Sequence, residues 1–133
     1  MRDILETGAT VIPVMSEKSK GLITETTIQW AAGKEVIQEL TGKMEHITVF
    51  DGDYRNKVLL ICPATYDQIG KFASGIADGT VEAMFAYALG HGVRIVIVPA
   101  MHLDMYRNPI MQENIQKLRR FGTFILDPII EDG

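Results

Sequence analysis

The stretch VLLICPATYDQIGKFASGIADG, residues 58–79, decides the fold of this chain. Its first five residues, Val58 to Cys62, are all apolar, which is typical of a short strand buried on both faces. Pro63 has no backbone N–H and is predicted to end the strand. Small and polar residues then lead into a helix. A helix N-terminus after a buried strand is where open α/β sheets bind ligands, anions among them.

Strands and helices alternate along the rest of the chain. Strands are predicted at residues 10–14, 94–98 and 123–126, and helices at residues 23–32, 67–72, 80–89 and 109–120. Residues 35–40 are predicted to be a short strand or an extended segment, and residues 42–56 mostly loop. This alternation predicts a parallel sheet covered on both faces. Polar turns after Val14, Cys62 and Val98 then converge on one crevice, which is the candidate site.

The composition predicts one soluble domain spanning residues 1–133. A net charge of −4 argues against a nucleic-acid partner. No apolar run reaches the roughly 18 residues that a membrane span needs, and no signal-peptide pattern is present, so a cytoplasmic protein without a membrane partner is expected. The single cysteine, Cys62, fits a reducing compartment and is predicted to be a core residue. No metal site is predicted.

Several motifs resemble a known family, the homo-oligomeric flavin-containing Cys decarboxylases, and among its branches most closely the phosphopantothenoylcysteine decarboxylase domain. The motifs that carry the resemblance are residues 63–69 (PATYDQI), 75–78 (GIAD), 99–102 (PAMH), Met105, and 108–109 (NP). The resemblance runs from about residue 3 to the end of the chain, in order. It implies a flavodoxin-like three-layer α/β/α sandwich, assembled as homotrimers or multiples of trimers, with FMN bound at subunit interfaces.

The resemblance also assigns roles to individual residues. The residues expected to bind FMN are Thr65, Tyr66, Asp67 and Gln68 in the turn after the central strand, Ser16, Lys18 and Ser19 near the flavin phosphate, and Ala100 against the flavin ring. His46 is expected to be the catalytic base. His102 is expected to bind the substrate carboxylate, with Met101 beside it; plain core packing is the alternative for Met101.

Several departures from the family pattern affect these expectations. Asp67 and His102 stand where the family has Asn, and a carboxylate beside a carboxylate substrate is unfavourable. A protonated His102 paired with Asp67 would restore neutrality. The segment between His46 and the central strand is longer than usual, which loosens the alignment of His46.

The largest departure is at the front of the chain. The family begins with a strand and a Gly-Ser-Ile-Ala turn, whereas here only the tail of the first helix, Met1 to Thr7, is recognisable. Three explanations stay open: the sequence starts too late, another chain supplies the strand, or residues 10–14 pair directly with residues 58–62.

The expected function is therefore that of an enzyme, an FMN-dependent decarboxylase (a lyase) acting on a cysteinyl carboxylate in coenzyme A biosynthesis. Two alternatives stay open. One is a flavin-dependent reductase or electron carrier of the archaeal dihydromethanopterin-reductase type, an oxidoreductase. The other is a non-catalytic paralogue or subunit that binds a partner chain.

Overall fold

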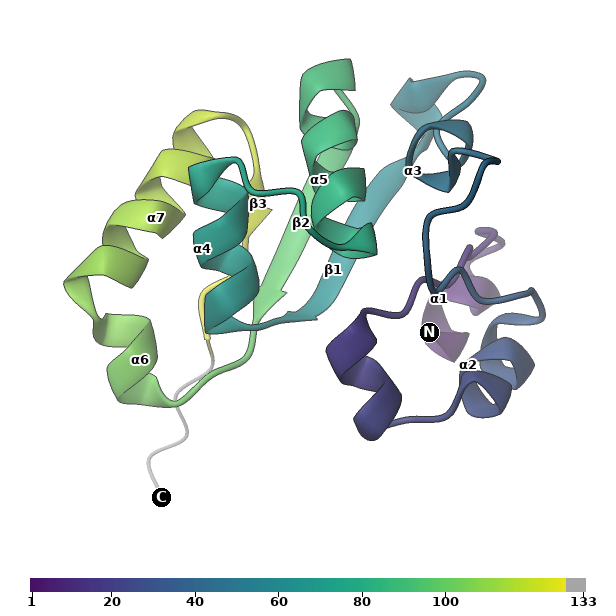
Figure 1. Cartoon of the computed structure of the whole chain (residues 1–133), viewed down its shortest axis with the longest axis horizontal. Helices are drawn as coiled ribbons and strands as arrows, with labels where there is room; N and C mark the ends of the chain where they lie inside the picture. Colours follow the sequence, from purple (N-terminus) through teal and green to yellow (C-terminus); the bar gives the residue numbers. More distant parts are fainter. Residues whose placement is uncertain (129–133) are drawn as a thin grey trace.

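Three parallel strands form one sheet in the order β1-β2-β3 (Figure 1). The structure is a computed structural model that describes residues 1–128. Parallel neighbours need a crossover between them, and helices supply each one here. The α/β flavodoxin-like fold expected from the sequence is confirmed.

From β1 to β3 the elements follow one another along the chain as predicted, and short helices are added in segments expected to be turns and loops. They are α1 (Arg2–Glu6), the 3₁₀ helix η1 (Glu17–Gly21), α2 (Glu25–Ala32), α3 (Glu45–Thr48), the 3₁₀ helix η2 (Tyr54–Asn56), β1 (Val58–Ala64), α4 (Tyr66–Ser74), α5 (Thr80–His91), β2 (Arg94–Pro99), α6 (Leu103–Arg107), α7 (Pro109–Arg120) and β3 (Phe124–Ile125).

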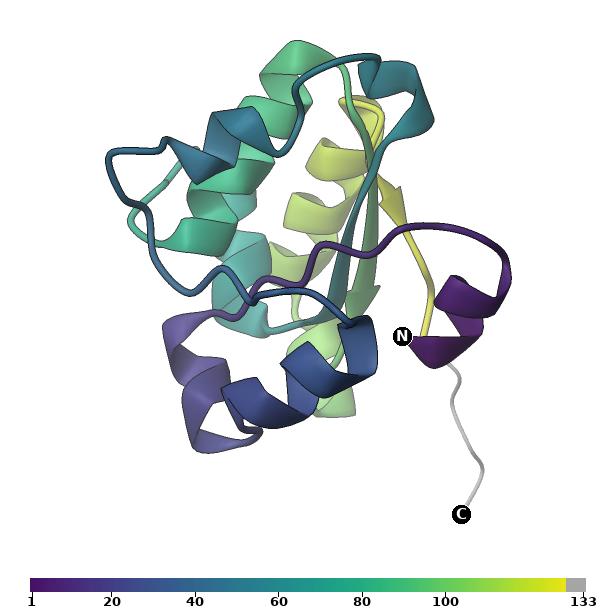
Figure 2. The same cartoon turned by 90° about the vertical axis from the view of Figure 1, so that its right-hand side faces the viewer.

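One face of the sheet carries the core. Helices α4, α5 and α7 lie together on this side (Figures 1 and 2). The buried side chains that meet there are Ile61, Ala64, Ile95, Ile97 and Ile125 from the strands, and Ile69, Phe72, Ala73, Met84, Phe85, Ala88, Met111, Ile115 and Leu118 from the helices. Burial of these apolar side chains is the main force holding the strands and helices together.

The opposite face of the sheet is exposed over β1 and β3. Val58 and Leu60 are 51% and 44% exposed, and Phe124 on β3 is 59% exposed. Cys62 is also exposed. The prediction that residues 58–62 are buried on both faces, with Cys62 in the core, is therefore wrong for the residues described. Side chains of a strand alternate between faces, and α4, α5 and α7 cover only one of them.

β1 continues past the proline that was expected to end it. Pro63 lies within the strand, and the register with β2 shifts between Ile61 and Ala64. Because β1 pairs with a partner on one side only among residues 1–128, Pro63 sits in an edge strand at an irregularity, which is where a residue without an N–H is tolerated. The ladder resumes at Ala64, whose carbonyl accepts a hydrogen bond from Ala100 N at 2.9 Å.

The predicted strand at residues 10–14 is reduced to a single bridge. Val14 pairs with Ile37 in parallel. Two hydrogen bonds form the bridge: Met15 N donates to Ile37 O at 2.9 Å, and Ile37 N donates to Pro13 O at 3.0 Å. Pro13 has no N–H with which to extend this ladder. This segment therefore does not pair with β1, which overturns the explanation that residues 10–14 have moved in beside residues 58–62.

Candidate functional site

Two of the polar turns predicted from the sequence meet at the carboxyl end of the sheet. The Ala64–Ala100 hydrogen bond joins the end of β1 to the loop that follows β2. Thr65 begins α4 directly after β1, and His102 begins α6 directly after the loop. This end of the sheet is the crevice in which α/β folds bind ligands.

The N-terminus of α4 is closed by a capping box. Thr65 Oγ1 accepts from Gln68 N at 3.2 Å, and Gln68 Oε1 accepts from Thr65 N at 3.1 Å. Ile69 N donates to Thr65 O. Of the first-turn donors, the N–H groups of Tyr66 and Asp67 have no acceptor within residues 1–128. These two N–H groups are therefore free to donate to an anion or to a polar ring edge.

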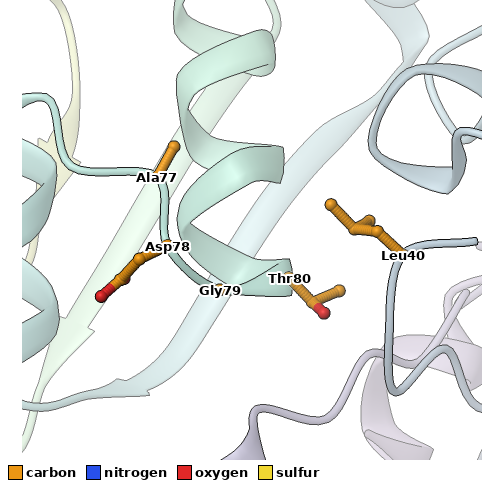
Figure 3. Close-up of a pocket in the computed structure, with 5 residues that line it drawn as sticks. All are labelled: Leu40, Ala77, Asp78, Gly79 and Thr80. Carbon is orange, nitrogen blue, oxygen red and sulfur yellow. The ribbon is translucent and has the colours of Figure 1, made fainter.

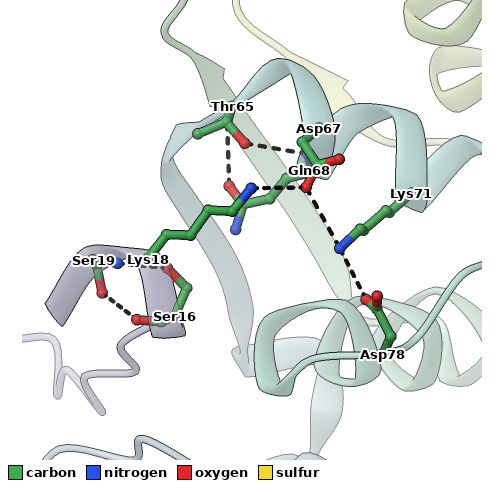
Figure 4. A network of polar contacts seen from close by, with 8 residues as sticks. All are labelled: Ser16, Lys18, Ser19, Thr65, Asp67, Gln68, Lys71 and Asp78. Atoms are coloured by element: carbon green, nitrogen blue, oxygen red, sulfur yellow. Dashed lines mark hydrogen bonds and ion pairs between the residues drawn. The ribbon is translucent and has the colours of Figure 1, made fainter. Parts of the chain in front are cut away.

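The turn after residue 15 reaches this helix through an ion pair. Lys18 Nζ lies 3.2 Å from Asp67 Oδ2, across 49 residues of sequence (Figure 4). Ser16 caps η1, accepting from Ser19 N at 3.3 Å, and Ser19 Oγ donates to Ser16 O at 2.7 Å. The structure thus brings together the two turns that were expected to bind one cofactor.

Asp67 is the centre of a chain of four charges. Lys71 Nζ lies 3.5 Å from Asp67 Oδ2 and 3.1 Å from Asp78 Oδ1 (Figure 4). The hydrogen bond from Lys18, with the charge of Lys71 behind it, lowers the pKa of Asp67, and the hydrogen bond to Asp78 raises the pKa of Lys71. The predicted pairing of Asp67 with His102 is not formed. Sequence reasoning missed Lys71, although its spacing of four residues from Asp67 on a helix was a usable signal.

His102 is the N-cap of α6. Its Nδ1 accepts a hydrogen bond from Asp104 N at 3.2 Å, and its side chain is 74% exposed. Because Nδ1 is the acceptor, the proton of the neutral ring lies on Nε2, which is then a donor. Met101 packs against the hydrophobic core instead. Its role as a substrate contact stays a prediction.

His46 lies away from the crevice, at the end of the sheet where β1 begins. It is on α3, edge-on to Tyr87 with ring centroids 6.5 Å apart. Tyr87 stacks on His91, and His91 contacts Tyr54, which lies just before β1 begins. In Figure 1, α3 lies near the start of β1, away from its end. Within the described residues, the structure therefore does not bring His46 together with Thr65, Asp67 or His102.

A shallow hollow of about 230 Å³ lies beside the crevice, between Leu40 and the start of α5 (Figure 3). Thr80, one of the residues that line it, donates through Oγ1 to Gln38 O at 3.3 Å. The buried Glu82 folds back so that its carboxylate occupies the place where a Cβ on Gly79 would be. Sites for ligands of the size of a drug usually measure roughly 300–1,000 Å³, so the hollow alone is small for a flavin.

Two structural features are absent from residues 1–128. None of their helices has the length and apolar character to cross a membrane. The same residues contain no group of three or more His, Cys, Asp or Glu side chains placed to hold a metal ion.

Comparisons with known proteins give relatives along the whole chain. The model of the family described as Flavoprotein matches residues 1–133. The coenzyme A biosynthesis bifunctional protein CoaBC of Thermococcus kodakarensis is 40% identical over 134 residues, covering 99% of this chain and 33% of that protein. This chain thus spans about a third of the length of the curated relatives it matches.

Solved structures also align with this chain. The FMN-dependent cysteine decarboxylase SpaF aligns with a TM-score of 0.75 and 29% identity, over 88% of this chain and 66% of that one. A PPC decarboxylase variant complexed with pantothenoylaminoethenethiol aligns with a TM-score of 0.76 and 20% identity, over 96% of this chain and 72% of that one. The second likeness supports the fold alone.

Proposed function

The chain belongs to the Flavoprotein family, and from this premise we propose that it is an FMN-binding decarboxylase domain. Its substrate is 4′-phosphopantothenoylcysteine, whose cysteinyl carboxylate it removes in coenzyme A biosynthesis. The observation that carries the proposal is the ion pair between Lys18 and Asp67, which joins η1 to the N-terminus of α4. The similarity to CoaBC and to FMN-dependent cysteine decarboxylases supports it.

The residues at the crevice suit FMN. The N–H groups of Tyr66 and Asp67 offer donors to an anion or to the polar edge of a flavin, as helix N-termini do for phosphates. Ser16 keeps its own O–H free for the phosphate, and the Ser19 O–H becomes available when it leaves Ser16 O. Lys18 lies beside them, with its charge shared with Asp67. Ala100 lies next to the end of β1 and is small enough for a flat ring to approach. When bound, FMN supplies the oxidation at the thiol end of the substrate that makes loss of CO₂ easy.

The charges in the crevice suit a carboxylate substrate in spite of Asp67. Lys18 and Lys71 both pair with Asp67, so its negative charge is neutralised before a substrate arrives. The repulsion expected between Asp67 and the substrate carboxylate is thereby reduced. His102 Nε2–H, left available by the cap on Nδ1, then binds the carboxylate as a donor.

The catalytic base requires a second copy of the chain. His46 lies at the end of the sheet where the strands begin, so it serves as a base only in the crevice of a neighbouring subunit. We therefore propose a homo-oligomer, a trimer or a multiple of trimers, with the cofactor between subunits. The small hollow beside the crevice agrees with a cofactor site completed by a second chain. A cytoplasmic location is part of the same proposal.

The position of His46 also favours a second candidate, a flavin-dependent reductase or electron carrier. Such a protein holds FMN with the same crevice and needs no base to act on a cysteinyl carboxylate. Turnover decides between the two candidates, because only the decarboxylase releases CO₂ from 4′-phosphopantothenoylcysteine.

The test is a titration of the purified chain with FMN, followed by a CO₂-release assay. We expect a flavin absorption band that co-elutes with the protein, and release of CO₂ that is lost in His46→Asn. Protein that stays colourless after incubation with FMN contradicts the cofactor. Bound FMN without CO₂ release contradicts the decarboxylase and leaves the reductase.

A further inference from the structure

Three side chains brace α6 against α7 and the chain that follows β3. Tyr106 Oη donates to Asp127 Oδ1 at 3.1 Å. Arg119 Nη2 donates to the same oxygen at 2.9 Å and to the carbonyl of Ile125 at 2.8 Å. One carboxylate oxygen thus receives a hydrogen bond from α6 and another from α7. Hydrogen bonds to an ionised acceptor are stronger than those between neutral groups.

The brace leads directly to His102. Tyr106 N donates to the carbonyl of His102 at 3.0 Å, and Gln112 Nε2 donates to the carbonyl of Tyr106 at 2.6 Å. Helix α6 has only five residues, and a helix this short does not hold its shape without tertiary contacts. The Tyr106 side chain is half-buried and packs against the core, so it anchors α6 to the rest of the fold.

The ionisation states support the same geometry. Burial raises the pKa of Tyr106, and the nearby carboxylate of Asp127 raises it further. The hydrogen bond from Arg119 lowers the pKa of Asp127. Around neutral pH the phenol is therefore a donor and the carboxylate an acceptor, which is what the observed hydrogen bond requires.

We propose that Tyr106 is a positioning residue: through Asp127 and Arg119 it holds α6 so that His102 stays at the crevice to bind the substrate carboxylate. This inference rests on the proposed function for the role of His102. The brace itself does not depend on that function, because all of its contacts are within the chain. It also gives Asp127 a role that no motif in the sequence indicated.

The first test compares Tyr106→Phe with the matched control Tyr54→Phe. Both variants lose only a hydroxyl, but that of Tyr54 has no hydrogen-bond partner within residues 1–128. Hydrogen exchange of FMN-free protein measures the brace directly. We expect the amides of α6 to exchange about tenfold faster in Tyr106→Phe and unchanged in Tyr54→Phe, because a hydrogen bond to a charged group is lost. Equal exchange in the two variants overturns the brace.

The second test separates positioning from folding by kinetics. In FMN-loaded protein we expect Tyr106→Phe to raise KM for 4′-phosphopantothenoylcysteine by about tenfold, with the Kd for FMN unchanged, because His102 contacts substrate and Thr65–Gln68 hold the cofactor. Asp127→Ala is expected to raise KM in the same way. Asp127→Asn keeps an acceptor oxygen and is expected to raise KM less. Faster exchange with an unchanged KM overturns the positioning role. A wild-type chain that binds no FMN overturns the proposed function, while the exchange measurement still decides the brace.

Discussion

The two faces of the sheet have similar residues and opposite surroundings. On the face that meets α4, α5 and α7, Ile97 is fully buried, whereas Leu60 on the opposite face is 44% exposed. Both are large aliphatic residues near the middle of neighbouring parallel strands. The difference teaches that a continuous apolar run identifies a strand, but what packs against each face decides which of its residues stabilise the fold.

The largest effect is expected from truncating one residue on each face. Ile97→Ala leaves a cavity among the helices and should lower the free energy of unfolding by about 2–5 kcal/mol. Leu60→Ala removes a side chain that is already half in water and should cost less than about 1 kcal/mol. Urea unfolding of both variants measures this. Equal losses would mean that the outer face is as well packed as the inner one.

A second effect concerns Gly79 at the start of α5, on the covered side. Gly79→Ala places a methyl group where the Glu82 carboxylate lies, and should cost about 1–3 kcal/mol because the carboxylate must move. The same change in a Glu82→Ala background has room for the methyl group, so its cost should fall close to zero. A double-mutant cycle by thermal unfolding checks this, and additive costs would refute the contact.

A smaller effect is expected at the crevice, which lies at the carboxyl end of the sheet and on neither face. Thr65→Ala removes the capping box of α4 and should cost about 1 kcal/mol. Thr65→Ser keeps the hydroxyl and serves as the matched control. The midpoint of urea unfolding measures both variants. A loss as large as that of Ile97→Ala would mean that the crevice contributes as much to stability as the covered face.

The smallest effect is a dependence on pH. The pKa of Asp67 is lowered below its ordinary value of 3.8 by Lys18 and Lys71, so its contribution to stability is present above that value. It is lost as the pH falls through the lowered pKa of the folded state. Asp67→Asn should therefore flatten the acid side of the stability profile, most visibly at low salt. Asp51→Asn, which removes an exposed carboxylate without an ion pair among residues 1–128, should leave the profile unchanged.

Much of the fold was predictable because its signals are local. Asn108 before Pro109 marked the start of α7, and its Oδ1 does accept from Ile110 N at 2.9 Å. Pro99 marked the end of the strand predicted at residues 94–98, and β2 does end at Pro99. Both residues act through their own backbone geometry, which the sequence contains in full.

The predictions that were wrong concern contacts with residues far away in the sequence. The segment at residues 10–14 has the composition of a strand, but among residues 1–128 only Ile37 pairs with it, through Val14. The exposure of Cys62 depends on what covers a face, which its own neighbours in sequence do not reveal.

The candidate site was predictable in its parts but not in its connections. The turns after β1 and β2 were identified from Pro63 and Pro99, and the structure joins them. The ion pair between Lys18 and Asp67 was not foreseen, because nothing local indicates which of many charges meet across 49 residues. The position of His46 depends on α3 packing against α5, which a resemblance in sequence does not fix.

The exposure of Cys62 makes the molecule convenient for spectroscopy. It is the only cysteine in the chain, and it lies on β1, three residues before Thr65 at the crevice. A maleimide dye or a nitroxide spin label would therefore attach at one known place without any mutation. Its emission or mobility would report, in real time and without an enzymatic assay, whether this part of the sheet becomes covered when subunits or cofactor are added.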